Sequence, residues 1–202
     1  MAESARIAFW LNIYNALLLH ELSLRPRRGH LFRHLRMFRR VSYAIGSETY
    51  SLDVIEHGML RANRRPPTWW RPLLRSGDRG LKAAIERVDP RIHFALNCGA
   101  RYCPPIRAYE ADSLNEQLRL ASRSYLASES NLDREARRVQ LPALMKIYRT
   151  DFGDRRRQLA FASEHLGPDA AWLREEGDPV EVSYGRYDWT LIAGTSHPEA
   201  AA

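Results

Sequence analysis

The only two cysteines of the chain lie in the segment HFALNCGARYCPP at residues 93–105. Cys98 comes directly before Gly99, where turn amides and nearby arginines can lower the pKa of a thiol and favour the reactive thiolate. Asn97 can donate a side-chain hydrogen bond to an oxyanion. This pattern favours nucleophilic chemistry at Cys98, whereas Cys103 is expected to pack against the two prolines that follow it.

A thiol nucleophile requires a general base, and two internal histidines are candidates. His93 lies five residues before Cys98, about 16 Å away if the segment is an extended strand, which is too far for direct contact. His57 is remote in the sequence, so packing of its helix against the strand can bring it to the thiol. We therefore expect His57 as the base, oriented by Glu56 or Asp188 in the manner of a catalytic triad.

Three other interpretations of the cysteine pair stay open. The C-x4-C spacing is at the wide end for structural zinc, with His57 and His93 as further ligands, but a second compact ligand pair is missing. A turn at Gly99 can bring the two cysteines within disulfide range, although the spacing is not the C-x-x-C of thioredoxin-like proteins. Free cysteines are also often simply buried. We expect neither a metal nor another cofactor.

Polar residues on the first expected helix form a second candidate group. The apolar spacing of residues 5–22 predicts a core-facing helix, on which Asn12 and Asn15 lie three residues apart. Buried asparagines need hydrogen-bond partners, so these two either tie down a neighbouring loop or line a site. The full set of expected binding residues is Asn12, Asn15, Arg91, His93 and Asp188.

Smaller elements are expected around these residues. Residues 41–52 predict a β-hairpin, and the segment DVIEHGMLR predicts a short helix with a capping box between Asp53 and Glu56. Alternation in RIHFALN predicts a short central strand, with His93 and Asn97 on one face. Helices are also expected at 81–88, 114–126 (with a capping box from Ser113 to Glu116) and 155–166, an irregular loop at 63–80, a strand at 139–141 and a hairpin over 180–192 closed at Gly185.

A chain of 202 residues, 45% of them apolar, can bury a core without disulfides or metals. We expect one domain over residues 5–193, with flexible ends at 1–4 and 194–202. Its expected class is α+β, helix-rich with small antiparallel hairpins and a short central strand, on a papain- or transglutaminase-like pattern. No apolar run reaches the roughly 20 residues of a spanning helix, and no export signal is visible. No membrane span and a cytoplasmic location are therefore expected.

The net charge of +7 comes from 31 basic residues, nearly all of them arginine. Arginine suits phosphate binding, but the arginines are spread along the chain and interleaved with acidic residues, which favours codon bias. The densest cluster, residues 25–40, is a candidate patch for nucleic acid or acidic lipid. A short helix with Leu31, Leu35 and Phe38 facing inward explains it better, so nucleic acid is not expected as a partner.

Several segments together resemble the bacterial and plant family described as domain of unknown function 547: AFWLNIYNALLLHEL, YSLDVIEHGMLR, DPRIHFALNCGARYCPPIRAY, KIYRTDFG and YDW. The resemblance extends from about residue 8 to residue 192. It implies a set of shared motif residues, which are Asn12, Tyr14, Asn15, Glu56, His57, Arg91, His93, Asn97, Cys98, Cys103, Pro104, Pro105, Asp188 and Trp189.

Relatives often have serine in place of Tyr102, which argues against a nucleophile there. Some relatives join the domain to a glutaredoxin-like domain and plant relatives to a leucine-zipper-like segment, which implies either thiol chemistry or an interaction module.

We predict a cysteine-dependent hydrolase or acyl transferase for a small molecule or peptide, with Cys98 as nucleophile and His57 as base. The alternatives are a non-catalytic protein-interaction or scaffold domain with a buried polar network, and a Cys/His zinc-binding or thiol-redox domain. Geometry separates them. A hydrogen bond between the Cys98 sulfur and a His57 nitrogen in an open cleft supports the enzyme, whereas apolar sealing of Cys98 contradicts it.

Overall fold

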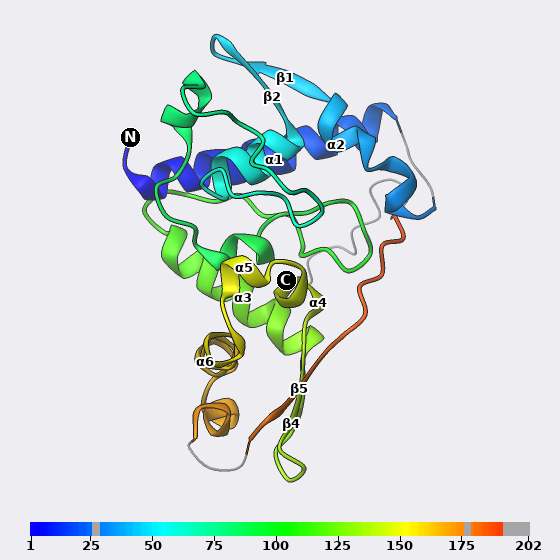
Figure 1. The fold of residues 1–202 in the computed structure, drawn as a ribbon, viewed down its shortest axis with the longest axis vertical. Helices are drawn as coiled ribbons and strands as arrows, with labels where there is room; N and C mark the ends of the chain where they lie inside the picture. Colours follow the sequence, from blue (N-terminus) through cyan, green and yellow to red (C-terminus); the bar gives the residue numbers. More distant parts are fainter. Residues whose placement is uncertain (26–28, 176–178, 192–202) are drawn as a thin grey trace.

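A computed structural model describes residues 1–25, 29–175 and 179–191, without the side chains of Phe32 and His34 (Figure 1). Helix α1 (Glu3–Leu24) crosses the upper half of the molecule in this view. Its apolar residues recur at helical spacing, and Leu11, Tyr14 and Leu18 are at most 1% exposed. The predicted core-facing helix is confirmed, and it includes residues 3 and 4, which were expected in a flexible end.

The predicted hairpin at residues 41–52 is confirmed. Strands β1 (Ser42–Ile45) and β2 (Glu48–Ser51) pair antiparallel, and Gly46 adopts a φ of +63° in the turn. The next segment forms the π-helix η2 (Val54–Leu60). The expected capping box is wrong, because the Asp53 side chain makes no cap hydrogen bond and the Val54 N–H donates to Ser51 Oγ at 3.2 Å.

The expected strand in RIHFALN is wrong. Residues Pro90–Phe94 form the 3-10 helix η4, which begins where the Asp89 side chain accepts a hydrogen bond from the Arg91 N–H at 3.0 Å. Proline lacks a backbone N–H, but at the first position of a helix that N–H would have no partner within the helix. Its fixed φ also matches the helix, so Pro90 favours a start at this position. Both supposed faces of the strand, including His93 and Phe94, are buried. The chain is therefore compact between His93 and Cys98 instead of extended.

Two further capping and helix predictions need correction. In place of the helix expected at 81–88, the structure has the 3-10 helix η3 (Arg79–Ala83). Ser113 makes no side-chain cap for the following helix, and Glu116 pairs with Arg119 at 2.5 Å. The predicted long helices are confirmed as α3 (Leu114–Glu129) and α6 (Arg155–Leu166). The remaining short helices are η1 (Leu31–His34), α2 (Arg36–Arg40), α4 (Ala143–Ile147), α5 (Arg149–Phe152) and η5 (Pro168–Arg174).

The second sheet contains β3 (Asn131–Asp133), β4 (Arg138–Leu141) and β5 (Glu181–Tyr184) in that order. Strand β4 was predicted, and it pairs antiparallel with β3 but parallel with β5. The predicted terminal hairpin closed at Gly185 is therefore wrong for the described residues.

After β5 the chain returns along one side of the molecule (Figure 1). The Leu31 N–H donates to the Trp189 oxygen and the Arg101 N–H to the Thr190 oxygen, both at 2.8 Å. This segment therefore joins the end of the described chain to the region of the cysteines. Residues 192 and 194–202, for which a hairpin end and a flexible tail were expected, lie outside the described residues.

Buried apolar residues form two clusters. The upper cluster gathers around α1 and η2 and includes Ile92, whereas the lower one lies between α3, α6 and β4 and includes Phe94. Helix η4 thus contributes to both. The α+β class is confirmed, with helices beside a two-stranded and a three-stranded sheet. The exact domain limits and the papain- or transglutaminase-like pattern stay predictions.

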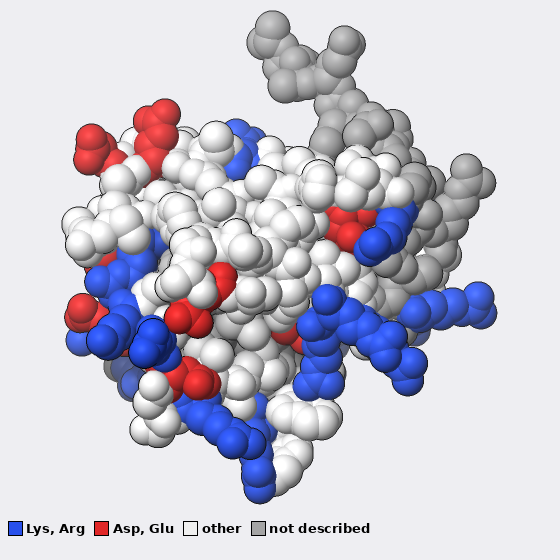
Figure 2. All heavy atoms as spheres, turned by 90° about the horizontal axis from the view of Figure 1, so that it is seen from above, with Lys and Arg blue, Asp and Glu red and all other residues white. Residues whose placement is uncertain are grey.

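Charged side chains of both signs lie interspersed on the face seen from above in Figure 2. The acidic residues number 24 against 31 basic ones. On that face the interleaving seen in the sequence is thus kept in three dimensions.

Candidate functional site

The turn after η4 folds the two cysteines against each other. The Cys98 and Cys103 sulfurs lie 2.7 Å apart as free thiols, and the Cys98 N–H donates to the Cys103 sulfur at 3.0 Å. Gly99 holds a φ of +83°, which a residue with a side chain rarely adopts. The side-chain oxygen Oδ1 of Asn97 accepts a hydrogen bond from the Gly99 N–H at 2.7 Å and fixes this turn. Both cysteines, and not Cys98 alone, therefore belong to the site.

The two thiols differ in acidity. Hydrogen bonding to Cys103, followed by burial, raises the pKa of Cys98. Burial also acts to raise the pKa of Cys103, but hydrogen bonds from Cys98, Tyr187 and nearby backbone groups outweigh it and lower that pKa. The Tyr187 hydroxyl is 3.2 Å from the Cys103 sulfur and 3.7 Å from that of Cys98. The donors thus converge on Cys103, which is the better thiolate of the pair.

Cys103 lies between two hollows of different size. A cavity of about 60 Å³ is lined by both cysteines together with Glu56, His93 and other residues. Cys103, but not Cys98, also lines a groove of about 460 Å³ whose rim includes Arg101 and Arg107. A molecule in the outer groove would therefore meet Cys103 first.

Glu56 is a buried carboxylate held by two tyrosines. Its side chain accepts hydrogen bonds from the Tyr148 hydroxyl at 2.6 Å and the Tyr14 hydroxyl at 3.3 Å. Burial opposes its charge, but His57, the Tyr148 hydrogen bond, His93 and Arg61 outweigh this and lower the pKa of Glu56. Glu56 is therefore ionised beside the sulfurs.

His57 does not reach Cys98. Its Nδ1 lies 3.1 Å from Nη1 of Arg61 and 3.6 Å from the Glu56 carboxylate. An arginine can only donate, so Nδ1 accepts, and burial lowers the pKa of His57. Over the described residues no hydrogen bond joins His57 to Cys98, whose sulfur contacts Cys103 and Tyr187. The expected Cys98–His57 pair is thus not formed, and η2 instead directs His57 toward Arg61.

A second buried charge cluster joins η2 to α5. Arg61 contacts both oxygens of Asp151, with Nε at 2.5 Å and Nη2 at 3.0 Å, and neither side chain is exposed. His93 Nε2 lies 2.9 Å from the same carboxylate. Burial acts to raise the pKa of Asp151, but His93 and Arg61 hold it well below its usual range. The carboxylate is therefore charged at any pH near neutrality.

His93 contacts the charge cluster through Asp151 and also lines the cavity of the thiols. Its ring stacks on Tyr148 with centroids 3.8 Å apart, and burial lowers its pKa despite the carboxylate. A neutral ring donates from Nε2 to Asp151, which leaves Nδ1 as an acceptor. Because η4 is not a strand, His93 and Cys98 line one cavity. The extended geometry behind the 16 Å estimate is therefore wrong, although no hydrogen bond joins His93 to Cys98 in the described residues.

The asparagines of α1 tie down loops. Asn12 makes two hydrogen bonds of 2.8 Å with the backbone of Tyr109. Asn15 donates to the Ala95 oxygen at 3.0 Å and accepts from the Asn97 N–H at 3.1 Å. Of the two roles considered for them, these contacts fit the loop-binding one.

Three other predicted residues make hydrogen bonds or ion pairs that do not involve the Cys98 sulfur or His57. Asn97 donates to the Pro104 oxygen at 2.7 Å and accepts from the turn, so its amide serves the backbone rather than an oxyanion. Arg91 pairs with Asp89 at 2.7 Å. Asp188 accepts from the Thr190 N–H at 2.9 Å and lies 3.4 Å from Arg101. In the part of the chain that is described, Asp188 therefore does not orient His57.

Four residues of the site were not predicted: Arg61, Tyr148, Asp151 and Tyr187. Each belongs to a segment used for the family resemblance, DVIEHGMLR, KIYRTDFG or the residues around YDW. The signal was therefore present in the motifs, although spacing alone assigns these residues no partner.

Metal ligation finds no support in residues 1–25, 29–175 and 179–191. These contain no group of three or more His, Cys, Asp or Glu side chains that could hold an ion. None of their helices is long and apolar enough to cross a membrane.

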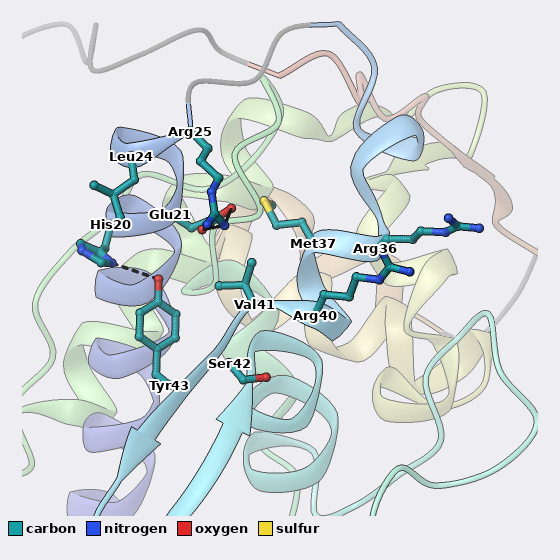
Figure 3. Close-up of a pocket in the computed structure, with 10 residues that line it drawn as sticks. All are labelled: His20, Glu21, Leu24, Arg25, Arg36, Met37, Arg40, Val41, Ser42 and Tyr43. Carbon is teal, nitrogen blue, oxygen red and sulfur yellow. Dashed lines mark hydrogen bonds and ion pairs between the residues drawn. The ribbon is translucent and has the colours of Figure 1, made fainter.

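A larger hollow of about 540 Å³ lies between α1, α2 and β1 (Figure 3). It is lined by His20, Arg25, Arg36 and other residues, and by none of the predicted site residues.

Fold and site together define an α+β protein with a dithiol beside a buried charge network. The family model described as "Protein of unknown function, DUF547" matches residues 1–126. The chain therefore belongs to this family, and the resemblance seen in the sequence is confirmed. Comparison with curated proteins and comparison with solved structures found no match. Tyr148, Asp151 and Tyr187 lie beyond the matched residues.

Proposed function

We propose that the protein carries out thiol–disulfide exchange, with Cys103 as the attacking thiolate and Cys98 as the resolving thiol. The observation that carries this proposal is the 2.7 Å separation of the two sulfurs. Further support comes from the direction of the donors, since the Cys98 N–H and the Tyr187 hydroxyl both approach the Cys103 sulfur. A dithiol with one acidic and one less acidic member suits the two steps of exchange.

In the first step the Cys103 thiolate attacks one sulfur of a substrate disulfide. A bond forms between Cys103 and that sulfur, the substrate S–S bond breaks, and one substrate thiolate leaves and takes up a proton. In the second step Cys98 loses its proton and attacks the Cys103 sulfur. The Cys98–Cys103 disulfide forms and the second substrate thiolate leaves. The substrate gains the two electrons that the protein dithiol loses.

The buried charge network supplies a proton acceptor for the second step. Cys98 has a raised pKa and needs a base to become a nucleophile. Glu56 and His93 line the same cavity as its sulfur. The Arg61–Asp151 pair holds the His93 ring in place, at 2.9 Å from Asp151. Either group can relay the Cys98 proton to the departing substrate thiolate, which is the stronger base and keeps the proton.

The test is to trap the mixed disulfide with glutathione disulfide as the probe. Cys98→Ser should accumulate glutathione on Cys103, measured as intact mass, because the resolving thiol is missing. Cys103→Ser should react at least about tenfold more slowly at Cys98, since burial still raises the pKa of that thiol and only Cys103 lines the larger groove. Wild type should form the internal disulfide and retain no glutathione. Tyr187→Phe serves as a matched variant that keeps both thiols and loses one donor to Cys103.

Two results would contradict this assignment. If Cys98→Ser and Cys103→Ser react equally fast, the proposed division of roles fails. If neither thiol of the folded protein reacts while both react after unfolding, thiol exchange fails altogether. A domain whose buried polar residues only fix the fold then becomes the better interpretation.

A second candidate is cysteine-dependent acyl transfer with Cys103 as nucleophile and His93 as base. The observation that favours it is the hydrogen bond between His93 and Asp151, which orients an imidazole in the cavity of the thiols. The two candidates separate cleanly. Acyl transfer to water or an amine, followed with p-nitrophenyl acetate, should survive Cys98→Ser and be lost in His93→Gln. Disulfide exchange should lose turnover in Cys98→Ser.

A further inference from the structure

A closed surface loop holds two adjacent tryptophans in solvent. The Asn63 side chain donates to the Leu74 oxygen at 3.0 Å and accepts from the Leu74 N–H at 3.2 Å, which joins the two ends of the loop. Trp69 is 44% and Trp70 is 63% exposed. Large exposed aromatic side chains on an anchored loop mark a surface that meets another molecule.

Arginines from two segments cover these rings. The Arg71 guanidinium lies 3.6 Å from the centre of the Trp70 ring, and Arg39 of α2 lies 4.5 Å from that of Trp69. Arg39 also lies 3.5 Å from Asp53. The Trp69 contact thus joins the tryptophan loop to the basic segment that the sequence singled out.

The joined segments have a one-sided charge. Residues 25–47 and 61–77 contain many arginines and no Asp or Glu. Arg36 and Arg40 are exposed, and their side chains extend to the same side of α2, away from Glu21, in Figure 3. We call this set the Arg–Trp surface, which consists of Arg36, Arg39, Arg40, Trp69, Trp70 and Arg71.

We propose that the Arg–Trp surface binds the interface of an anionic phospholipid bilayer. Tryptophan rings favour the headgroup level of membranes, where one end is apolar and the other wet. Arginine forks bind phosphate, and basic residues near an anionic leaflet add to binding. The loop is closed by Asn63 and Leu74 and rich in proline, so its ordering costs little on binding. Nucleic acid fits less well, because a guanidinium already covers one of the two faces of each ring and leaves only the other for base stacking.

The experiment is cosedimentation with vesicles of phosphatidylcholine alone and of phosphatidylcholine mixed with phosphatidylglycerol. The full chain should bind the anionic vesicles at low ionic strength and lose binding at high ionic strength. Trp69→Ala/Trp70→Ala should bind at least about tenfold more weakly. Arg40→Gln/Arg71→Gln should lose about 25-fold, because each arginine near an anionic surface contributes about fivefold.

Matched variants elsewhere on the surface serve as controls. Arg134→Gln/Arg138→Gln removes two charges and Leu120→Ala removes an exposed apolar side chain, and both should bind like wild type. Brominated lipids should quench tryptophan fluorescence in wild type far more than in the double tryptophan variant, since the other tryptophans are buried (Trp10 and Trp172, each 2% exposed) or half-buried (Trp189). The proposal fails if the tryptophan variant binds like wild type, if neutral and anionic vesicles bind alike, or if only DNA or an acidic protein binds.

Discussion

Arg61 and Arg71 both lie over an aromatic ring, but in opposite surroundings. Arg61 is fully buried, 5.1 Å from the centre of the Tyr148 ring, and its guanidinium contacts Asp151, His57 and two further groups. Arg71 is exposed over Trp70, and in the described part of the chain it makes no hydrogen bond. The same pair of residue types thus stabilises the interior in one place and is available to a ligand in the other.

The largest expected effect is the loss of the carboxylate partner of Arg61. Asp151→Ala leaves the Arg61 guanidinium buried without its counter-charge, so the free energy of unfolding should fall by about 3–5 kcal/mol. Urea denaturation measures this. Glu116→Ala removes an exposed pair with Arg119 and should change stability little. Equal effects of the two substitutions would show that the buried cluster is not stabilising.

The next largest effect is expected from Tyr148→Phe. It removes the 2.6 Å hydrogen bond to the charged Glu56 but keeps the ring that stacks on His93. The expected cost is about 1.5–3 kcal/mol, typical of a hydrogen bond to a charged group. Tyr184→Phe removes a neutral hydrogen bond to Gln158 of 2.7 Å and should cost about 1 kcal/mol. The reverse order would argue that Glu56 is not ionised.

The pH dependence of stability is a further test of how buried charged groups differ from exposed ones. Burial lowers the pKa of His57 and of His93 in the folded protein. Between about pH 7 and pH 5 these histidines therefore bind more protons in the unfolded chain than in the folded one. Stability should therefore fall on acidification. Burial raises the pKa of Asp53 to about 7, which gives the opposite slope and offsets part of the fall.

Asp53→Asn removes that offset. Its stability should fall more steeply with acidification than that of wild type, by up to about 1.4 kcal/mol per pH unit. Thermal unfolding of both proteins over this range measures the difference. Parallel pH profiles would mean that Asp53 titrates normally in the folded protein.

The smallest effect on stability is expected at the exposed arginine. Arg71→Gln should change the free energy of unfolding by no more than about 0.5 kcal/mol while lowering the affinity for anionic vesicles about fivefold. Arg61→Gln should do the opposite, with a large loss of stability. Comparable stability losses at the two positions would remove the distinction between the two environments.

Local signals sufficed for much of the fold. Apolar spacing predicted α1, α3 and α6, and the Gly-containing connection predicted the β1–β2 hairpin. The strand assigned to RIHFALN failed because both sets of alternating positions are buried, so the alternation does not mark an exposed face. Asp89 and Pro90 are a helix start, and their signal outweighed the alternation.

The sequence predicted which residues line the site better than it predicted the contacts between them. Glu56, His93, Cys98 and Asn97 do lie around one cavity, but the partner of each was assigned incorrectly or left open. Residue spacing describes neighbours on one helix or strand, whereas Tyr148 and Glu56 lie 92 positions apart. Such pairings depend on how helices pack and have no local sequence signal.

The contact between Arg61 and Asp151 spans 90 positions, and that between Cys103 and Tyr187 spans 84. When residues 1–126, which the family model matches, are present without the rest of the chain, both Asp151 and Tyr187 are missing. Their glutamate, histidines and arginine would then have to remain hydrated, because burial without partners is costly. We therefore expect residues 1–126 on their own to leave this interior open to solvent, and the contacts to Asp151 and Tyr187 to be needed to close it.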